Sequence, residues 1–124
     1  MNLVFQDQQQ LIEATGYLPA VSLIMPFHPV MASKRDLEYQ LKRAMEQIES
    51  RLMQQYPRDR ALPVLEKLRK MINTLNYNTH KKSIAIFASP LIEKVYYLDV
   101  AVEEKVVVDS SFEIRDLVYS QKQT

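Results

Sequence analysis

The chain contains no cysteine among its 124 residues. Disulfide bonds, thiolate metal sites and catalysis by a cysteine nucleophile are therefore excluded. Glycine is almost as scarce, because Gly16 is its single occurrence. Loops that cradle phosphate groups, in both the Walker and the dinucleotide-binding motifs, need glycines at several fixed positions. The sequence therefore excludes the usual glycine-rich nucleotide-binding motifs.

Long apolar runs are also missing. No run approaches the roughly 18 residues that a membrane-spanning helix needs, and the N-terminus lacks a basic region followed by an apolar one. We therefore expect a cytoplasmic protein without membrane contact. Its length predicts one domain over residues 1–118, followed by a polar tail over 119–124 that ends the chain or links it to further domains.

Residues that carry catalysis or hold metals are few. The two histidines, His28 and His80, have neither the His-x₃-His nor the Glu-x-x-His spacing of a metal site. No serine lies in a Gly-x-Ser-x-Gly motif. We therefore expect no enzymatic activity, no cofactor and no bound metal from this chain.

A long helix is expected over residues 34–56. Ser33 is a suitable N-cap residue, and Asp36 follows three positions later, a variant of the capping box. Apolar residues then recur at spacings of three and four, which places them on one face of a helix. This stripe consists of Leu37, Leu41, Ala44, Ile48 and Leu52.

A second helix is expected over residues 61–76, after a turn at 57–60. Proline is tolerated only in the first turn of a helix, so Pro63 predicts that this helix does not begin much before Ala61. Its apolar residues have the same spacing as those of the first helix. They are Ala61, Leu65, Leu68, Ile72 and Leu75.

Four strands complete the predicted domain. The first covers the apolar run 20–25, and the others cover 83–88, 94–100 and 102–108. Short breaks separate the last three, which predicts an antiparallel meander. In the order strand, helix, helix, strand, strand, strand, the simplest packing is an α+β fold. It has a four-stranded, mainly antiparallel sheet with the long helical hairpin on one face.

Both faces of this sheet are expected to be covered, because Ile84 and Ile86 alternate with Ala85 and Phe87 along one strand. We expect a short N-terminal helix, Asp7–Thr15, over part of the second face. The predicted core consists of Leu41, Ile48, Leu65, Leu68, Ile72, Ile86 and Phe87.

Positive charge is concentrated in the predicted hairpin. Residues 28–82 carry twelve Lys and Arg against six Asp and Glu, whereas the whole chain has a net charge of only +1. Several cations on one surface can bind phosphates, and an aromatic side chain beside them can stack on an RNA base. Tyr56, beside the turn arginines, is the expected stacking residue. The RNA-binding candidates are Tyr56, Arg58, Arg60, Lys34, Arg35, Lys42, Arg43, Lys81 and Lys82.

Two other interpretations use the same residues. An ordinary solvated helix face explains them as well, since six acidic residues interleave with the basic ones. A protein–protein interaction module, or a homodimer formed through the hairpin or an exposed strand edge, would need no RNA at all.

The C-terminal third contains the most distinctive sequence of the chain. It has the run Ile84–Pro90 (IAIFASP), a strand ending in Tyr96-Tyr97-Leu98, the run Val102–Val108 and the closing Phe112-Glu113-Ile114. Together with the upstream run Val21–Pro26, these segments resemble the N-terminal domain of the bacterial homologues of archaeo-eukaryotic peptide-chain release factors. The resemblance spans roughly residues 18–118. It implies a translation-linked domain that contacts the ribosome or ribosomal RNA.

The same resemblance limits what can be transferred. In the related release factors the tip of the helical hairpin reads the stop codon, and that tip matches Tyr56–Arg60 here. The family's Asn-Ile-Lys-Ser and Tyr-x-Cys-x-x-x-Phe elements are missing. Its catalytic Gly-Gly-Gln belongs to a following domain and is missing as well. The resemblance therefore implies neither stop-codon reading nor peptidyl-tRNA hydrolysis.

Overall fold

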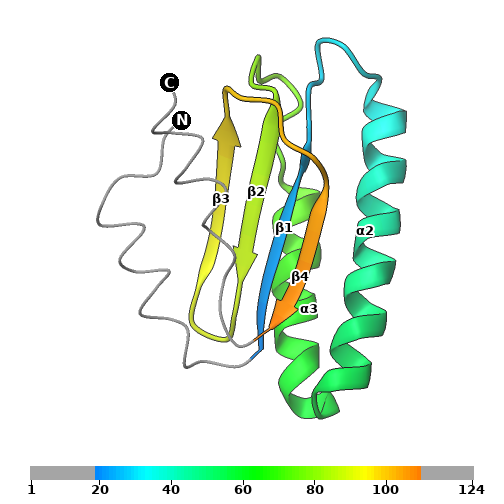
Figure 1. The fold of residues 1–124 in the computed structure, drawn as a ribbon, viewed down its shortest axis with the longest axis vertical. Coiled ribbons are helices and arrows are strands. Elements are labelled where there is room, and N and C mark those ends of the chain that lie inside the picture. The colour runs from blue at the N-terminus through cyan, green and yellow to red at the C-terminus, as the bar shows by residue number, and fades with distance from the viewer. Residues whose placement is uncertain (1–18, 110–124) are drawn as a thin grey trace.

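The computed structural model describes residues 19–109, which form one four-stranded sheet and two helices (Figure 1). The strands lie in the order β3-β2-β1-β4, and every neighbouring pair is antiparallel. The predicted α+β class and the predicted order of elements are confirmed. Along the chain the elements are β1 (Ala20–Pro26), α2 (Lys34–Gln55), α3 (Arg58–Asn73), β2 (Ser83–Ala88), β3 (Glu93–Leu98) and β4 (Lys105–Asp109).

The predicted meander is wrong at its last strand. β2 and β3 form a hairpin, but β4 pairs with β1, with Val108 opposite Val21 and Val106 opposite Leu23. The segment 99–104, part of which was predicted to be strand, crosses the end of the sheet instead (Figure 1). The reason lies in β1, of which every residue except Pro26 is buried. Such a strand is stable with a neighbour on each side, whereas the less buried β3 and β4 can form the edges.

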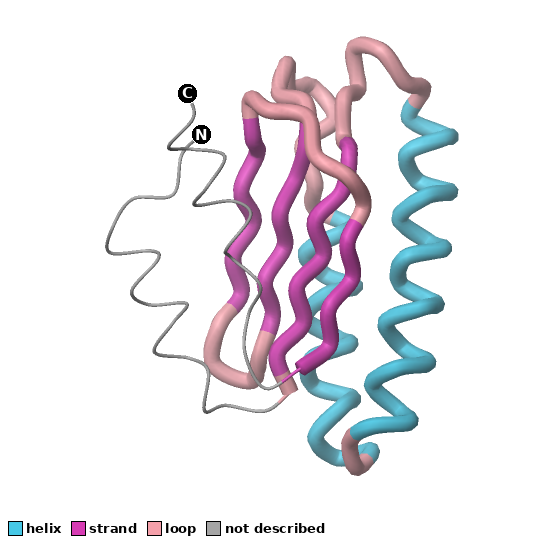
Figure 2. Tube along the Cα trace, viewed as in Figure 1, coloured by secondary structure: helices cyan, strands magenta, loops and turns pink. Residues whose placement is uncertain are grey.

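α2 forms as predicted and covers one face of the sheet together with α3 (Figure 2). The Ser33 side chain accepts a hydrogen bond of 3.1 Å from the backbone N–H of Asp36, which satisfies one of the free donors at the helix start. The predicted apolar stripe of this helix is buried throughout: Leu37, Leu41, Ala44, Ile48 and Leu52.

α3 begins three residues earlier than predicted, at Arg58, with Pro57 at its N-cap position. Pro63 therefore lies in the second turn, where it removes the hydrogen bond to the carbonyl of Asp59. Asp59 is exposed, so water can take the place of that donor. Burial on this helix also differs slightly from the prediction, because Ile72 is only half-buried whereas Val64 and Met71 are buried.

The core has two parts, one on each face of the sheet. The larger lies between the sheet and the helices, and contains the predicted Leu41, Ile48, Leu65, Leu68 and Ile86. The smaller contains Ile24, Phe87, Tyr96 and Leu98 on the other face. The predicted helix Asp7–Thr15 and the closing run Phe112-Glu113-Ile114 lie outside the described residues.

The turn between β2 and β3 is held by a lysine from α3. The Lys67 ammonium donates to the carbonyls of Ser89 and Pro90, at 3.1 and 2.7 Å. The Ser89 hydroxyl in turn accepts from the backbone N–H groups of Leu91 and Ile92, at 3.3 and 3.1 Å. This cluster fixes the hairpin against the helix layer.

We expect Lys67→Met to lower the free energy of unfolding by about 1–2 kcal/mol. Removal of the ammonium leaves two part-buried carbonyls without their hydrogen-bond donor. Lys70→Met is the matched control, since Lys70 is exposed on the same helix. Urea denaturation of both variants measures the difference. Equal midpoints for the two would show that the lysine adds nothing to the turn.

Candidate nucleic-acid interface

The structure distributes the predicted RNA-binding residues over three places along the hairpin. α2 has 22 residues and is therefore about 33 Å long. Its start and its end lie at opposite ends of the molecule (Figure 1). The turn carries Tyr56, Arg58 and Arg60, the middle of α2 carries Lys42 and Arg43, and the far end carries Lys34, Arg35, Lys81 and Lys82.

Tyr56 offers little free ring surface. Its side chain is half-buried and packs against the core between the helices and the sheet. Burial raises the pKa of the Tyr56 hydroxyl, and the nearby charge of Asp109 raises it further. The phenol is therefore neutral at physiological pH and serves the packing of the turn.

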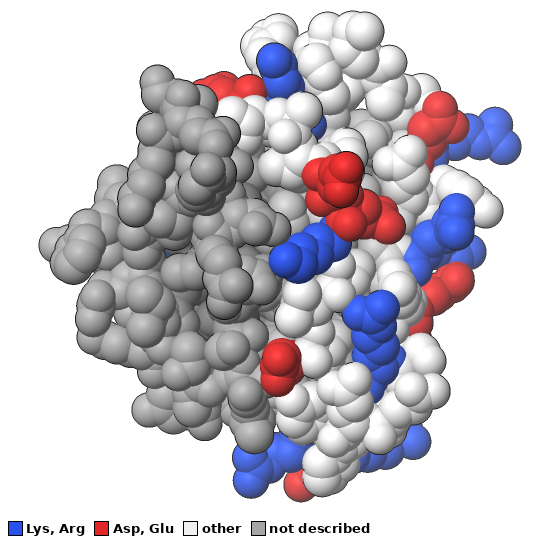
Figure 3. Space-filling model, viewed as in Figure 1, with Lys and Arg blue, Asp and Glu red and all other residues white. Residues whose placement is uncertain are grey.

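Tyr39 is the exposed aromatic of the hairpin, and the sequence analysis did not single it out. It lies on α2, and its surface is 62% exposed. Arg35 and Arg43 are four residues before and after it, so they are its neighbours on the same helix face. The spacing in the sequence could have revealed this group, since residues opposite a buried stripe face solvent. Figure 3 shows cations and carboxylates alternating along the side of the molecule that α2 forms.

A groove of about 480 Å³ runs between α2 and α3 at the end of the hairpin away from the turn. From α2, Lys34, Glu38 and Lys42 line it at successive turns of the helix. From α3, Arg69 and Asn73 line the opposite side. The groove also has apolar lining, contributed by Leu41, Met45, Ile72 and Leu75.

Tyr77 lines the groove beyond the end of α3, and an aromatic cluster holds it there. Its ring lies 5.2 Å from that of Phe27, which also contacts Tyr97 edge-on at 6.3 Å. The Tyr97 hydroxyl accepts a hydrogen bond of 2.9 Å from the backbone N–H of Asn76, next to Tyr77. The Lys34 ammonium also lies 5.1 Å from the centre of the Tyr77 ring, a cation–π contact.

The charges in this groove are unequal. Lys34, Lys42 and Arg69 supply three cations, and Glu38 supplies one carboxylate. Arg69 is paired with Glu49 at 3.3 Å, but both side chains are about half exposed, so the pair is weak. Burial raises the pKa of the Tyr77 hydroxyl, and the charge of Glu38 raises it further, so these two groups lie near each other. The groove therefore suits a ligand with a negative group and some hydrogen-bond donors.

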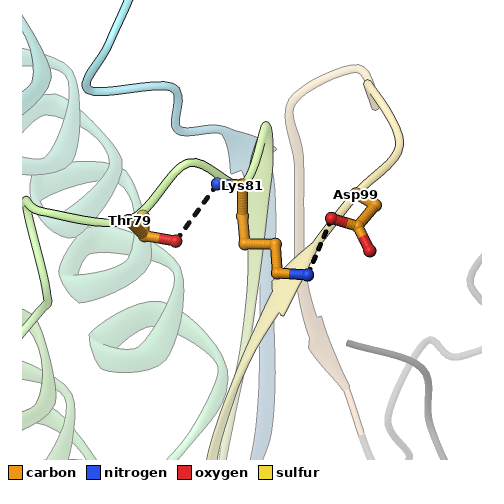
Figure 4. A network of polar contacts seen from close by, with 3 residues as sticks. All are labelled: Thr79, Lys81 and Asp99. Carbon is orange, nitrogen blue, oxygen red and sulfur yellow. Dashed lines mark hydrogen bonds and ion pairs between the residues drawn. The ribbon is translucent and has the colours of Figure 1, made fainter.

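Lys81 belongs to a different cluster (Figure 4). Its ammonium lies 2.7 Å from a carboxylate oxygen of Asp99, and its backbone N–H donates to the Thr79 hydroxyl at 3.1 Å. The hydrogen bond raises the pKa of Lys81 and lowers the pKa of Asp99. Because this ammonium already faces a carboxylate, it is a weaker phosphate ligand than Lys42 or Arg43.

Other kinds of site are not found in the part of the chain that the structure describes. Within residues 19–109, no group of three or more His, Cys, Asp and Glu side chains could hold a metal ion. None of the described helices combines the length and the apolar character that crossing a membrane requires.

No protein-family model and no curated protein matches this chain. The resemblance to the release factor-like domains therefore stays a prediction.

Proposed function

We propose that this chain is a non-catalytic, translation-linked domain that contacts ribosomal RNA through the basic face of its helical hairpin. The observation that supports this best is the exposed Tyr39 between Arg35 and Arg43 on α2. Contact with single-stranded RNA needs cations for the phosphates and an aromatic surface on which a base can stack. This face of α2 offers both within three turns of helix.

The adjoining residues extend the same surface. Lys42 lies next to Arg43, and Lys34 and Arg69 line the neighbouring groove. Arg58 and Arg60, at the turn, form a second cationic group at the far end of α2. A strand of RNA that follows the helix could use both groups, whereas a short contact would use one.

The experiment compares two double variants in binding to a single-stranded RNA and to ribosomes. Arg35→Gln/Arg43→Gln removes two cations beside Tyr39, and Arg58→Gln/Arg60→Gln removes two at the turn. Each lost phosphate contact lowers the salt dependence of binding by about 0.7 on a log–log plot, so about 1.4 is expected for the first pair. Tyr39→Ala should weaken RNA binding by about five- to 150-fold, the usual range for one stacked base.

Glu103→Gln/Glu104→Gln is the charge control. Both carboxylates are exposed before β4, and Glu104 lines a small hollow with Arg43, so its removal takes away a competitor for that cation. The double variant should leave RNA binding unchanged or slightly stronger. If neither arginine pair changes RNA binding, or if the chain does not sediment with ribosomes at low salt, the hairpin does not contact RNA.

Protein–protein interaction is the second candidate function. Val30 and Met31 support it, since they are 60% and 78% exposed in the connection between β1 and α2. Exposed apolar side chains of this kind can mark an interface. A dimer formed there would appear in light scattering as a mass that rises with concentration, and Val30→Ser/Met31→Ser would abolish it.

A further inference from the structure

We infer that the groove between α2 and α3 binds a nucleoside 5′-phosphate whose base carries an amino group, either free or as one residue of an RNA strand. Only the second case rests on the proposed function. The volume of about 480 Å³ lies within the usual range for small-molecule sites, roughly 300–1,000 Å³, and is suited to a single nucleotide.

The cations of the groove are suited to bind the phosphate group of the nucleotide. Lys42 lies on one helix and Arg69 on the other, so a phosphate between the helices can meet a donor from each side, whereas Lys34 lies about 12 Å further along α2. Arginine can bind two phosphate oxygens at once, and lysine adds a point charge. Within residues 19–109, Lys34 and Lys42 have no ion-pair partner, since the ion pairs there are Arg69–Glu49 and Lys81–Asp99. The site therefore needs no glycine-rich loop.

The apolar lining of the groove is suited to contact the base of the nucleotide. Met45 and Ile72 are half-buried in the groove, and a planar base can cover their apolar surface. Tyr77 is already fixed by Phe27 and by Lys34, so this side of the groove is formed before any ligand arrives. A preformed wall removes part of the entropy cost of binding.

The carboxylate of Glu38 determines which base is preferred. It repels a phosphate in its neighbourhood, but it accepts hydrogen bonds from the amino groups of adenine, guanine and cytosine. Uracil has no amino group, and its single edge donor, the N3–H, lies between two carbonyl oxygens that repel a carboxylate, so uracil pairs less well with Glu38. The amide of Asn73 can both donate and accept, and so fits any base edge. The groove should therefore favour AMP, GMP and CMP over UMP.

The first test is titration of the full chain with AMP, GMP, UMP, adenosine and inorganic phosphate, followed by NMR or calorimetry. We expect AMP and GMP to bind at least about tenfold more tightly than UMP, a difference on the scale of one hydrogen bond to a charged group. Adenosine and inorganic phosphate should each bind more weakly than AMP. If all the nucleotides and inorganic phosphate bind with the same affinity, the groove is only an anion site. If none of them binds at millimolar concentration, the groove is not a binding site. Both results overturn the inference.

Variants then locate the binding. Arg69→Gln should weaken AMP binding about tenfold, whereas Lys70→Gln, the neighbouring exposed lysine, should not. Glu38→Gln should abolish the preference for AMP over UMP, because a neutral amide can also donate to uracil. Retention of the preference in this variant would overturn the role of the carboxylate.

The outcomes separate this inference from the proposed function. If AMP binds in the groove but single-stranded RNA does not bind, the proposed function fails and the groove is a site for free nucleotides. If RNA binds, depends on Tyr39 and is insensitive to Arg69→Gln, while AMP does not bind, the inference fails and the proposed function stands.

Discussion

Replacing Leu68 by alanine is expected to lower the free energy of unfolding by about 2–5 kcal/mol. Leu68 lies on the buried face of α3 and has no exposed surface. It belongs to the cluster in which α2, α3 and the sheet meet. Truncation removes apolar contacts with both layers and leaves a cavity that the surrounding elements can only partly fill. Urea denaturation followed by circular dichroism measures the loss.

Leu91→Ala is the matched control, because the same change is made on a leucine that is 64% exposed. Changes at exposed positions usually stay within about 0.5 kcal/mol. If Leu68→Ala costs less than 1 kcal/mol, or no more than Leu91→Ala, Leu68 does not contribute to the core in the way that its burial indicates.

The helices were predictable because the information that determines them is local. The spacing of Leu37, Leu41 and Ile48 places them on one helix face, and Ser33 provides the cap from a position directly before the helix. The start of α3 was placed three residues too late for a related reason. The rule for proline describes an average helix, and it does not take into account that water can bind the freed carbonyl of an exposed Asp59.

The position of β4 could not be predicted in the same way. Its sequence is compatible with pairing to β3 or to β1, and the choice depends on what the rest of the sheet needs. Because β1 is buried on both faces, it takes β4 as its second neighbour. The pairing of β4 is therefore a property of the whole sheet, and it cannot be predicted from the sequence of adjacent segments alone.

In the candidate site, too, some features follow from the local sequence and others only from the packed fold. The charge excess of residues 28–82 correctly marks the hairpin as the basic part of the chain. The length of α2 nevertheless separates Lys34 from Arg58, so the nine residues do not form one surface. The groove depends on Phe27, Tyr77 and Tyr97, which are far apart in the sequence and meet only after the sheet and the hairpin have packed.

Phe27→Ala is expected to lower the free energy of unfolding by about 3–5 kcal/mol, the range for truncation of a buried aromatic. Phe27 has no exposed surface, and its ring contacts both Tyr77 and Tyr97. Its backbone N–H donates to the carbonyl of Lys82 at 2.9 Å, which extends the pairing of β1 with β2. The substitution leaves this bond in place, so the loss reports on the side chain alone.

Phe27→Leu separates the packing of the core from the shape of the groove. It keeps most of the apolar volume and should cost less than about 1.5 kcal/mol, but it removes the aromatic contact that orients Tyr77. The near-ultraviolet circular dichroism of the tyrosines should decrease, and AMP should bind the folded variant more weakly. If the tyrosine signal and AMP binding both stay unchanged, Tyr77 is positioned without Phe27. The aromatic cluster would then stabilise the fold without shaping the groove.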